Sequence, residues 1–314
     1  MNRTRWLTVL GISFLLSLLL VTGCGGQASE PQNNDANGEE EGAAQESASI
    51  MIAGSDSEVN LVTRLVEEYM NANSHVVIAV TGGGSGVGIS SLIDGDIDIA
   101  NSSRPMKEAE EADLKANQGQ DAHAVRFAVD GVAVVVNKEN PVAELTVDQI
   151  GAIYRGEITN WSEVGGENLG ITLYGRQSTS GTYVFFMEKV VQADYSPEMR
   201  NLAGTSDIVE AVTNDLGGIG YAAIGYATKE GIKAVKVAAD EASEAFDPTI
   251  LENVTSGDYP LTRPLYQFVI GKPSGAILDF LLFEVSEVGQ QLVLEEGFYP
   301  ITNADVDFNK KALQ

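Results

Sequence analysis

The sequence predicts an α/β protein of two domains. Segments with the character of strands alternate with segments of helical spacing along most of the chain, and this alternation is typical of an α/β fold. A chain of 314 residues has room for about two domains of ordinary size. Three of the strand-like segments end in turns of glycine and small hydroxyl residues. Such turns favour a ligand site at the carboxyl edge of a sheet.

The first residues have the pattern of an export signal. Arg3 and Arg5 precede a mostly apolar stretch that is short for a membrane span, and small residues then lead to Cys24, the single cysteine of the chain. This order resembles the bacterial lipoprotein signal, which implies a signal peptide over residues 1–23 and a lipid anchor, such as palmitate, on Cys24. The alternative is an ordinary signal peptide or membrane anchor with an incidental cysteine. One cysteine allows no intrachain disulfide.

Residues 24–49 predict an acidic, disordered tether. They contain six acidic residues and neither a basic nor an aromatic residue, so they cannot bury enough surface to fold. The whole chain has a formal net charge of −26, which argues against nucleic-acid binding. Because this charge repels anions at long range, an anion site in this protein must depend on local hydrogen bonds and dipoles.

The first half of the folded part predicts strands followed by helices. We expect strands at 49–53, 75–80 and 97–100, and helices at 59–70 and 107–118. The loop Thr81–Ile89 is rich in glycine but matches neither the Walker A pattern nor the dinucleotide fingerprint. It allows backbone N–H groups to approach a ligand, with Ser85 as a hydroxyl donor. The alternative is a flexible turn.

A long apolar run over residues 124–137 is interrupted by Asp130 and Gly131. A buried aspartate is costly without partners, so Asp130 is either a satisfied structural acid or part of a polar cleft. A long strand that crosses between two domains would place it at the hinge. The later part predicts further elements in order, with helices at 146–154, 183–191, 207–213, 275–286 and 287–296, and strands at 171–174, 217–226, 232–237 and 265–270.

Residues 175–186 have the character of half an anion site. Arg176 offers a planar fork of donors that suits an oxyanion. Ser180, Gly181 and Thr182 fall at the expected start of a helix, where backbone N–H groups and the helix dipole favour a negative ligand. The alternative is that Ser180 only caps the helix while Arg176 forms a surface ion pair.

Six motifs, taken in their order, resemble the phosphate-binding proteins of bacterial phosphate ABC transporters. The likeness extends over residues 50–300 and includes the motifs Gly54-Ser55-Asp56-Ser57, Gly83-Gly84-Ser85-Gly86, Ala100-Asn101-Ser102-Ser103-Arg104, Asp130-Gly131-Val132-Ala133, Ile158-Thr159-Asn160-Trp161, and Arg176 with Ser180-Gly181-Thr182. The resemblance implies a two-lobed periplasmic-binding-protein fold of type II with a ligand cleft between the lobes. It also implies two hinge crossings, near 127–137 and 263–270. Lobe 1 would comprise residues 50–130 and 267–314, and lobe 2 residues 131–266.

The resemblance also implies roles for particular residues. Donors from lobe 1 would come from Ser55, Asp56, Ser57 and Ser85, and donors from lobe 2 from Arg176, Ser180, Gly181 and Thr182. Ser103 stands at the end of its strand, where relatives carry an acid that accepts the ligand's proton. We therefore expect Asp130 to accept that proton and to orient Arg176. Asp56 either caps a helix or accepts a second proton.

The predicted function is capture of inorganic phosphate outside the cytoplasm, by a monomeric, membrane-anchored lipoprotein that delivers it to the permease subunits of an ABC importer. No cofactor or metal is expected. One alternative is a binding protein for sulfate, molybdate or arsenate. Another is an exported hydrolase that acts on phosphate compounds, although we find no G-x-S-x-G or Ser-x-x-Lys motif and only two histidines, His75 and His123.

Overall fold

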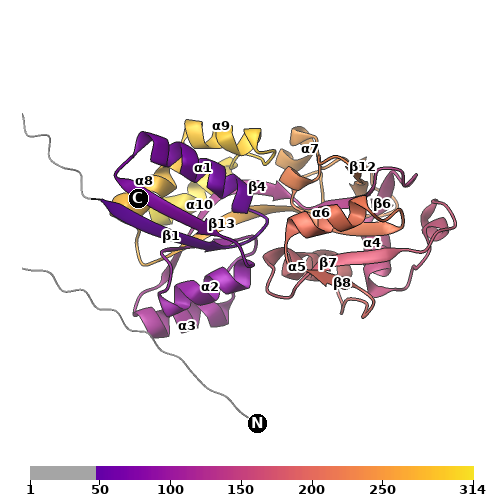
Figure 1. Ribbon diagram of the computed structural model, residues 1–314, viewed down its shortest axis with the longest axis horizontal. Helices are drawn as coiled ribbons and strands as arrows, with labels where there is room; N and C mark the ends of the chain where they lie inside the picture. The colour runs from indigo at the N-terminus through magenta and orange to yellow at the C-terminus, as the bar shows by residue number, and fades with distance from the viewer. Residues whose placement is uncertain (1–46) are drawn as a thin grey trace, which may run out of the picture. The chain divides into compact units, whose positions relative to one another are not determined.

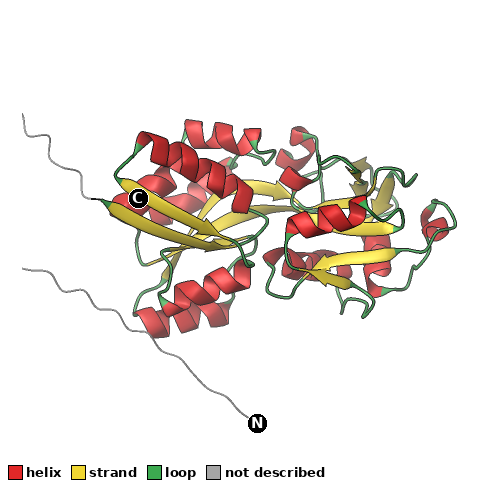
Figure 2. Cartoon of the chain, viewed as in Figure 1, coloured by secondary structure: helices red, strands yellow, loops and turns green. Residues whose placement is uncertain are grey.

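The computed structural model describes residues 47–314, which form a body of strands and helices (Figures 1 and 2). The predicted signal peptide, Cys24 and residues 24–46 of the predicted tether lie outside these described residues. The first strand, β1 (Ala48–Gly54), already includes the last two residues of that tether. Within residues 47–314, no helix combines the length and the apolar character needed to cross a membrane.

The first sheet has five strands in the order β2-β1-β3-β13-β4. β1 pairs in parallel with β2 and β3, whereas β13 lies antiparallel between β3 and β4. Figure 1 shows α1 and α9 on one face of this sheet and α2 and α3 on the other. The bounds are β2 (Val76–Thr81), β3 (Ile99–Ser102), β4 (Ala122–Gly131), β13 (Thr262–Ile270), α1 (Val59–Ala72), α2 (Ser85–Asp94), α3 (Glu108–Gln118), α8 (Gly275–Glu284), α9 (Glu287–Glu295) and α10 (Asn303–Leu313).

The second sheet also has five strands, in the order β10-β5-β9-β7-β8, and a third sheet of three short strands has the order β12-β11-β6. A short π-helical turn, Met187–Val191, continues α5. The bounds are β5 (Ala133–Asn137), β7 (Thr172–Arg176), β8 (Arg200–Leu202), β9 (Gly218–Ala222), β10 (Ile232–Ala234), β6 (Glu144–Thr146), β11 (Lys236–Ala238), β12 (Ala245–Phe246), α4 (Val147–Arg155), α5 (Gly181–Phe186), α6 (Thr205–Thr213) and α7 (Leu251–Thr255), with 3₁₀ turns at Trp161–Val164 and Ile224–Tyr226.

The apolar run 124–137 forms two strands instead of one. β4 belongs to the first sheet and β5 to the second, and Val132 lies between them. The N–H of Val132 donates to the carbonyl oxygen of Leu261 at 2.9 Å. The chain therefore leaves the first sheet beside the segment by which it returns. β13 then pairs with β4 along its whole length, so the boundary predicted at residue 266 falls inside a strand of the first sheet.

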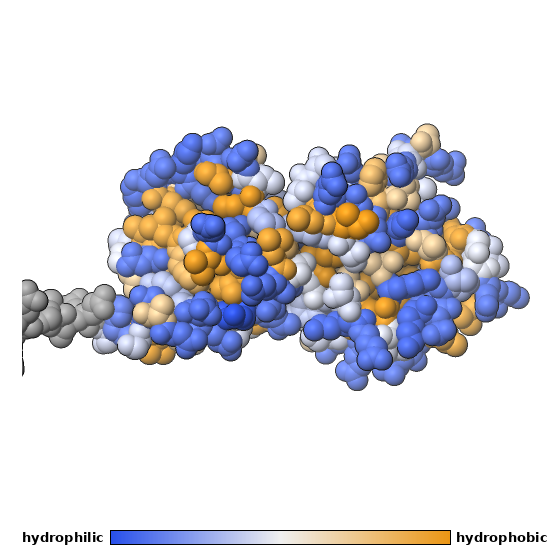
Figure 3. All heavy atoms as spheres, turned by 90° about the horizontal axis from the view of Figure 1, so that it is seen from above, coloured by the Kyte–Doolittle hydropathy of each residue, from blue (hydrophilic) through white to orange (hydrophobic). Residues whose placement is uncertain are grey.

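The core follows the apolar patterns of the sequence. Helix α1 buries Leu61, Val62, Leu65, Val66 and Tyr69, which recur at helical spacing and face the first sheet. In the second sheet every residue of β5 and of β9 is buried, as expected for central strands covered on both faces. Figure 3 shows polar residues over much of one face of the body, with small apolar patches between them.

Candidate functional site

The carboxyl ends of β1, β2 and β3 bring together three serines that the sequence analysis singled out. Ser55, Ser85 and Ser103 are all buried, with 2% or less of each exposed. The Ser55 hydroxyl donates to Ser103 Oγ at 3.1 Å, and the backbone N–H of Ser103 donates to Ser85 Oγ at 3.1 Å. Neighbouring parallel strands end at the same edge of the sheet, which explains why residues 48 positions apart meet here.

A second group of predicted residues comes from the loop after β7. Ser180 precedes α5, and its Oγ accepts the N–H groups of Thr182 and Tyr183 at 3.2 and 3.4 Å. Ser180 is thus a helix cap, which was one of the two alternatives for this residue. The Thr182 hydroxyl is hydrogen-bonded to the hydroxyl of Ser57 at 2.7 Å. The loops of the two sheets are therefore in direct contact.

Gly181 lies where any side chain would collide with the serines of the first sheet. A Cβ at this position would lie 2.3 Å from Ser85 Oγ and 2.6 Å from Ser103 Oγ. These distances are too short for non-bonded atoms, so only glycine allows this approach without a shift of its neighbours. We call the five buried hydroxyl residues around it the hydroxyl cluster: Ser55, Ser57, Ser85, Ser103 and Thr182.

Arg176 lies at the end of β7 with 2% of its surface exposed, so the alternative of a surface ion pair is wrong. Its Nη1 donates to Thr205 Oγ1 at 2.8 Å, and its Nη2 donates to the Ala203 carbonyl oxygen at 2.8 Å. Nη2 also donates to Asp56 Oδ2. The Nε–H of Arg176 is buried and has no hydrogen-bond partner among the described residues. Arg176 therefore keeps a donor for a further acceptor.

Asp56 does not cap a helix, because α1 begins at Val59 after Glu58 and has no side-chain cap. Its Oδ1 accepts the N–H of Gly83 at 2.9 Å, and its Oδ2 forms the ion pair with Arg176. The Asp56 side chain remains 19% exposed. Asp56 thus joins the loop after β1 to the glycine-rich loop after β2 and to the second sheet.

Asp130 does not orient Arg176, contrary to the expectation from the sequence. Its Oδ2 accepts from Arg263 Nε at 3.0 Å and from Arg263 Nη2 at 2.8 Å, while its Oδ1 accepts the N–H of Ile224 at 2.9 Å. The Asp130 side chain is fully buried. The residue is therefore a satisfied structural acid, one of the two roles left open for it.

Arg263 is the principal residue that the sequence analysis missed at this site. Its Nη2 also donates to Thr182 Oγ1 at 2.9 Å, and its Nη1 donates to the Ser103 carbonyl oxygen at 3.1 Å. Arg176 is therefore not the only buried positive charge beside the hydroxyl cluster. Thr205 was missed as well, although it begins α6 just after β8 and so repeats the strand-to-helix pattern that identified the other hydroxyls.

Two tyrosines next to Arg176 and Asp56 are neutral at ordinary pH. Burial raises the pKa of Tyr221 to about 12, although the backbone N–H of Arg176 donates to its hydroxyl and opposes the shift. Burial, and then the charge of Asp56, raise the pKa of Tyr226 to about 12. The Tyr226 hydroxyl donates to the backbone oxygen of Asp56 at 3.2 Å. Both phenols thus fix the positions of the charged pair without adding charge.

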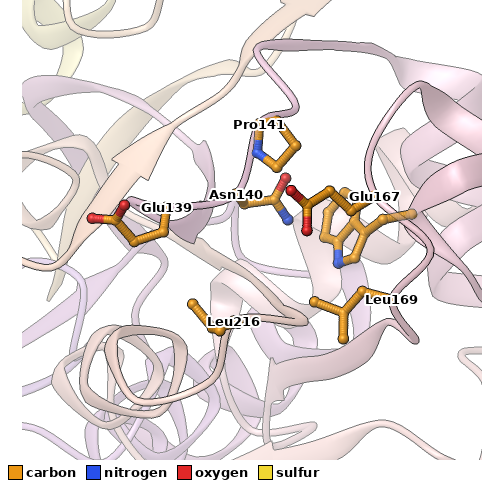
Figure 4. Close-up of a pocket in the computed structure, with 7 residues that line it drawn as sticks. Glu139, Asn140, Pro141, Glu167, Leu169 and Leu216 are labelled. Atoms are coloured by element: carbon orange, nitrogen blue, oxygen red, sulfur yellow. The ribbon is translucent and has the colours of Figure 1, made fainter.

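Two further observations on residues 47–314 concern other places where a ligand could bind. In that part of the chain, no three His, Cys, Asp or Glu side chains are grouped so that they could hold a metal ion. A hollow of about 230 Å³ beside the second sheet shares no residue with the hydroxyl cluster (Figure 4). It is lined by Glu139, Asn140, Pro141, Trp161, Glu167, Leu169 and Leu216.

Comparison with known proteins agrees with this geometry. Residues 39–288 match a family described as the PBP superfamily domain. The chain is 33% identical to the phosphate-binding protein PstS of Pseudomonas aeruginosa, over 81% of this chain and 84% of the relative. It is 28% identical to the phosphate-binding protein PstS of Bacillus subtilis, over 98% of this chain and 97% of the relative.

A crystal structure from Clostridium perfringens, assigned as the substrate-binding protein of a phosphate ABC transporter and containing bound phosphate, is 30% identical to this chain. The two folds superpose with a TM-score of 0.72 over 81% of this chain and 100% of the other. The chain therefore belongs to the PBP superfamily and, within it, to the family of phosphate-binding proteins of ABC transporters.

Proposed function

We propose that this protein binds inorganic phosphate between the two sheets, with the hydroxyl cluster and Arg176 as donors. The observation that carries the proposal is the unpartnered, buried Nε–H of Arg176, whose guanidinium pairs with Asp56, the residue between Ser55 and Ser57 of the hydroxyl cluster. An oxyanion supplies the acceptor that this donor lacks, and charge-assisted hydrogen bonds from a guanidinium are among the stronger ones. The names of the relatives and the bound phosphate of the Clostridium perfringens structure support the same ligand.

Asp56 is better placed than Asp130 to accept the proton that phosphate carries at neutral pH. Asp130 is fully buried and its two oxygens accept three hydrogen bonds inside the protein, whereas each oxygen of Asp56 accepts one. Asp56 is partly exposed and lies on Arg176, the same side chain that has the unpartnered donor. A carboxylate here accepts a hydrogen bond from the protonated oxygen of phosphate. Sulfate has no proton to donate, so its oxygen and the carboxylate oxygen would face each other as two acceptors. Selectivity by such a mismatch is a general device.

Titration calorimetry with phosphate and with sulfate tests this assignment on the wild type and on Asp56→Asn. We expect the variant to lose at least tenfold in phosphate affinity, the equivalent of about 1.4 kcal/mol, and to discriminate less against sulfate. Asp113→Asn, an exposed aspartate on α3, is the charge-matched control. An unchanged ratio of phosphate to sulfate affinity in Asp56→Asn would remove Asp56 from this role.

The same titrations separate phosphate from the alternative oxyanions. Molybdate or arsenate binding more tightly than phosphate would reassign the ligand, because the donors of the hydroxyl cluster suit any tetrahedral oxyanion. The alternative of a hydrolase is not supported, since the relatives are binding components of transporters and not enzymes. The chain is accordingly a binding protein.

Donors from both sheets imply closure around the ligand. The two sheets would belong to two lobes. One lobe would be formed by residues up to 131 together with β13 and the helices that follow it, and the other lobe by the residues between Gly131 and β13. The single break between β4 and β5 and the adjacent return at Leu261 support this division. Phosphate would stabilise the closed form in proportion to its higher affinity for that form. Small-angle scattering with and without phosphate tests it, and identical curves would contradict it.

Delivery to an ABC importer follows from the family, whose members are extracytoplasmic binding proteins. The lipid anchor on Cys24 and the monomeric state belong to the proposal. In cells fed a labelled fatty acid, the wild type should carry label and remain with the membrane, whereas Cys24→Ser should be unlabelled and released. Label retained by Cys24→Ser would overturn the anchor.

A further inference from the structure

Two glutamates are completely buried behind the hydroxyl cluster and take no part in the proposed contacts with phosphate. Glu58 directly precedes α1, three residues after Ser55, and its backbone N–H donates to the Ser55 carbonyl oxygen at 3.2 Å. Glu284 is the last residue of α8. Neither side chain has any exposed surface. A buried carboxylate is costly unless a positive group compensates it.

Glu284 belongs to a polar network that continues into the site, and Glu58 lies close enough to Glu284 for its charge to act on that carboxyl group. Gln267 of β13 donates from Nε2 to Glu284 Oε1 and to Asn101 Oδ1, both at 3.1 Å. The carbonyl oxygen of Asn101 accepts the N–H of Ser55 at 3.0 Å. The network therefore lies between α1, α8 and the first sheet, and it contacts the backbone that holds Ser55.

The hydrogen-bonding groups of this network are unbalanced as they stand. Four buried oxygens lack a donor, namely both carboxyl oxygens of Glu58, Oε2 of Glu284 and Oε1 of Gln267, whereas Asn101 Nδ2 is the single donor without an acceptor. Two protons, one on each carboxyl group, would add two O–H donors where donors are missing. The count thus favours a neutral pair of acids.

The charged groups around the two glutamates do not stabilise their ionised forms enough to outweigh burial. Burial raises the pKa of Glu58 well above its usual range, while the Ser55 hydroxyl and the charge of Arg263 lower it by less and Asp130 raises it. Ser55 lies near Glu58, although its hydroxyl is hydrogen-bonded to Ser103 in this structure. Burial also raises the pKa of Glu284, with Gln267 opposing the shift and Glu58 adding to it. Both acids thus favour the neutral form.

We propose that Glu58 is a positioning residue for the phosphate site, which acts as a neutral acid supported by a second neutral acid, Glu284. This inference rests on the proposed function. A neutral Glu58 does not compete for the single proton of the Ser55 hydroxyl, which donates to Ser103 Oγ in this structure and can turn to the bound anion. A charged Glu58 would take that proton as a hydrogen-bond acceptor and would place a negative charge directly behind the anion. Phosphate capture therefore weakens at alkaline pH when Glu58 loses its proton.

Titration calorimetry with phosphate, from mildly acidic to alkaline pH, tests the inference on the wild type and on the double variant Glu58→Gln, Glu284→Gln. Glutamine keeps the shape of the neutral acid and cannot ionise. The ratio of the two dissociation constants cancels the titration of phosphate itself, which is the same for both proteins. We expect similar affinities at acidic pH. Above the pKa of Glu58, the wild type should lose about tenfold per pH unit relative to the variant.

A second measurement does not depend on how well the variant folds. Infrared spectroscopy of the wild-type protein should show the C=O band of buried, protonated carboxylic acid near neutral pH, and this band should disappear over the pH range in which the affinity falls. Equal pH profiles for the wild type and the double variant would overturn the inference. The absence of the band would also overturn it. An affinity that follows sodium concentration instead of pH would do so too, because a cation would then satisfy the buried carboxyl oxygens in place of protons. If neither protein binds phosphate at any pH, the proposed function itself fails.

Discussion

Two buried arginines near the hydroxyl cluster each pair with an aspartate, and the two pairs differ in how completely their hydrogen-bonding groups are satisfied. Arg263 and Asp130 are 3% and 0% exposed, and both oxygens of Asp130 accept hydrogen bonds. Arg176 is equally buried, but its partner Asp56 is 19% exposed and its own Nε–H has no partner among residues 47–314. The carboxylate of the first pair is thus fully hydrogen-bonded within the protein, whereas the arginine of the second pair can still donate one hydrogen bond.

This difference separates a structural role from a ligand role for the same two residue types. A fully paired, buried ion pair contributes mainly through the cost of breaking it, because removal of one partner leaves a buried charge uncompensated. A pair with an unpartnered donor can bind an anion without first losing an internal hydrogen bond. We therefore expect Arg263–Asp130 to control stability and Arg176–Asp56 to control affinity.

The largest effect should come from Asp130→Asn, which leaves the Arg263 guanidinium buried without its counter-charge. We expect a loss of about 3–5 kcal/mol in the free energy of unfolding, measured by urea denaturation. Asp56→Asn should reduce the unfolding free energy by less, since Asp56 is partly exposed. Equal losses for the two variants would erase the distinction between the pairs.

Arg176→Lys should have the largest effect on affinity. Lysine keeps the charge but loses the planar fork, including the Nε–H that has no partner in the described part of the chain. We expect phosphate binding to weaken by about 2–3 kcal/mol, or about 30- to 140-fold, in titration calorimetry. Arg64→Lys, in an i,i+4 pair on α1, is the matched control. Wild-type affinity in Arg176→Lys would assign the anion to another donor.

Gly181→Ala should have an intermediate effect, because the added methyl group would push the loop after β7 away from the loops after β2 and β3. The added methyl group meets Ser85 Oγ and Ser103 Oγ, and overpacking of this kind costs about 1–2 kcal/mol. The loss should appear in phosphate affinity more than in stability. Gly170→Ala, which has open space around its Cβ position, is the control. If the two alanine variants bind phosphate equally well, contact between these loops is not needed for binding.

Thr182→Val should have the smallest effect. The Thr182 hydroxyl connects the two arginine–carboxylate pairs. It accepts a hydrogen bond from Arg263 and is hydrogen-bonded to Ser57, the residue after Asp56. Its removal should weaken phosphate binding by about 1 kcal/mol, or about fivefold. Thr63→Val, whose hydroxyl bonds only to the preceding turn of α1, should leave the affinity unchanged. A loss as large as that in Arg176→Lys would place Thr182 among the principal ligands.

The sequence predicts those parts of the fold that have a strong local period. Helix α1 is an example, since its five buried apolar residues recur at helical spacing. Helix α10 was missed because its buried residues include Asp305 and Asn309, so no apolar stripe indicates it. The division of residues 124–137 into β4 and β5 was also missed. Both strands are apolar and buried, and only the change of sheet separates them.

Some residues of the candidate site could be predicted from a local sequence pattern and others could not. The hydroxyl residues follow strand ends, so a local pattern identifies them without knowledge of the fold. The partners of the charged residues could not be predicted, because Asp130 and Arg263 are 133 positions apart and Asp56 and Arg176 are 120 positions apart. No local pattern connects residues at such separations, which explains why Asp130 was matched to the wrong arginine.

The central place of β13 in the first sheet has a consequence for the order of folding. β3 and β4 are close in sequence but cannot pair with each other, because β13 lies between them. During synthesis β4 must therefore wait for residues 262–270, which pair with it from more than a hundred positions away, before it can join the first sheet. Long-range pairing of this kind makes folding slow. The three strands β2, β1 and β3, which pair with one another, therefore lack their connection to β4 until β13 has been made.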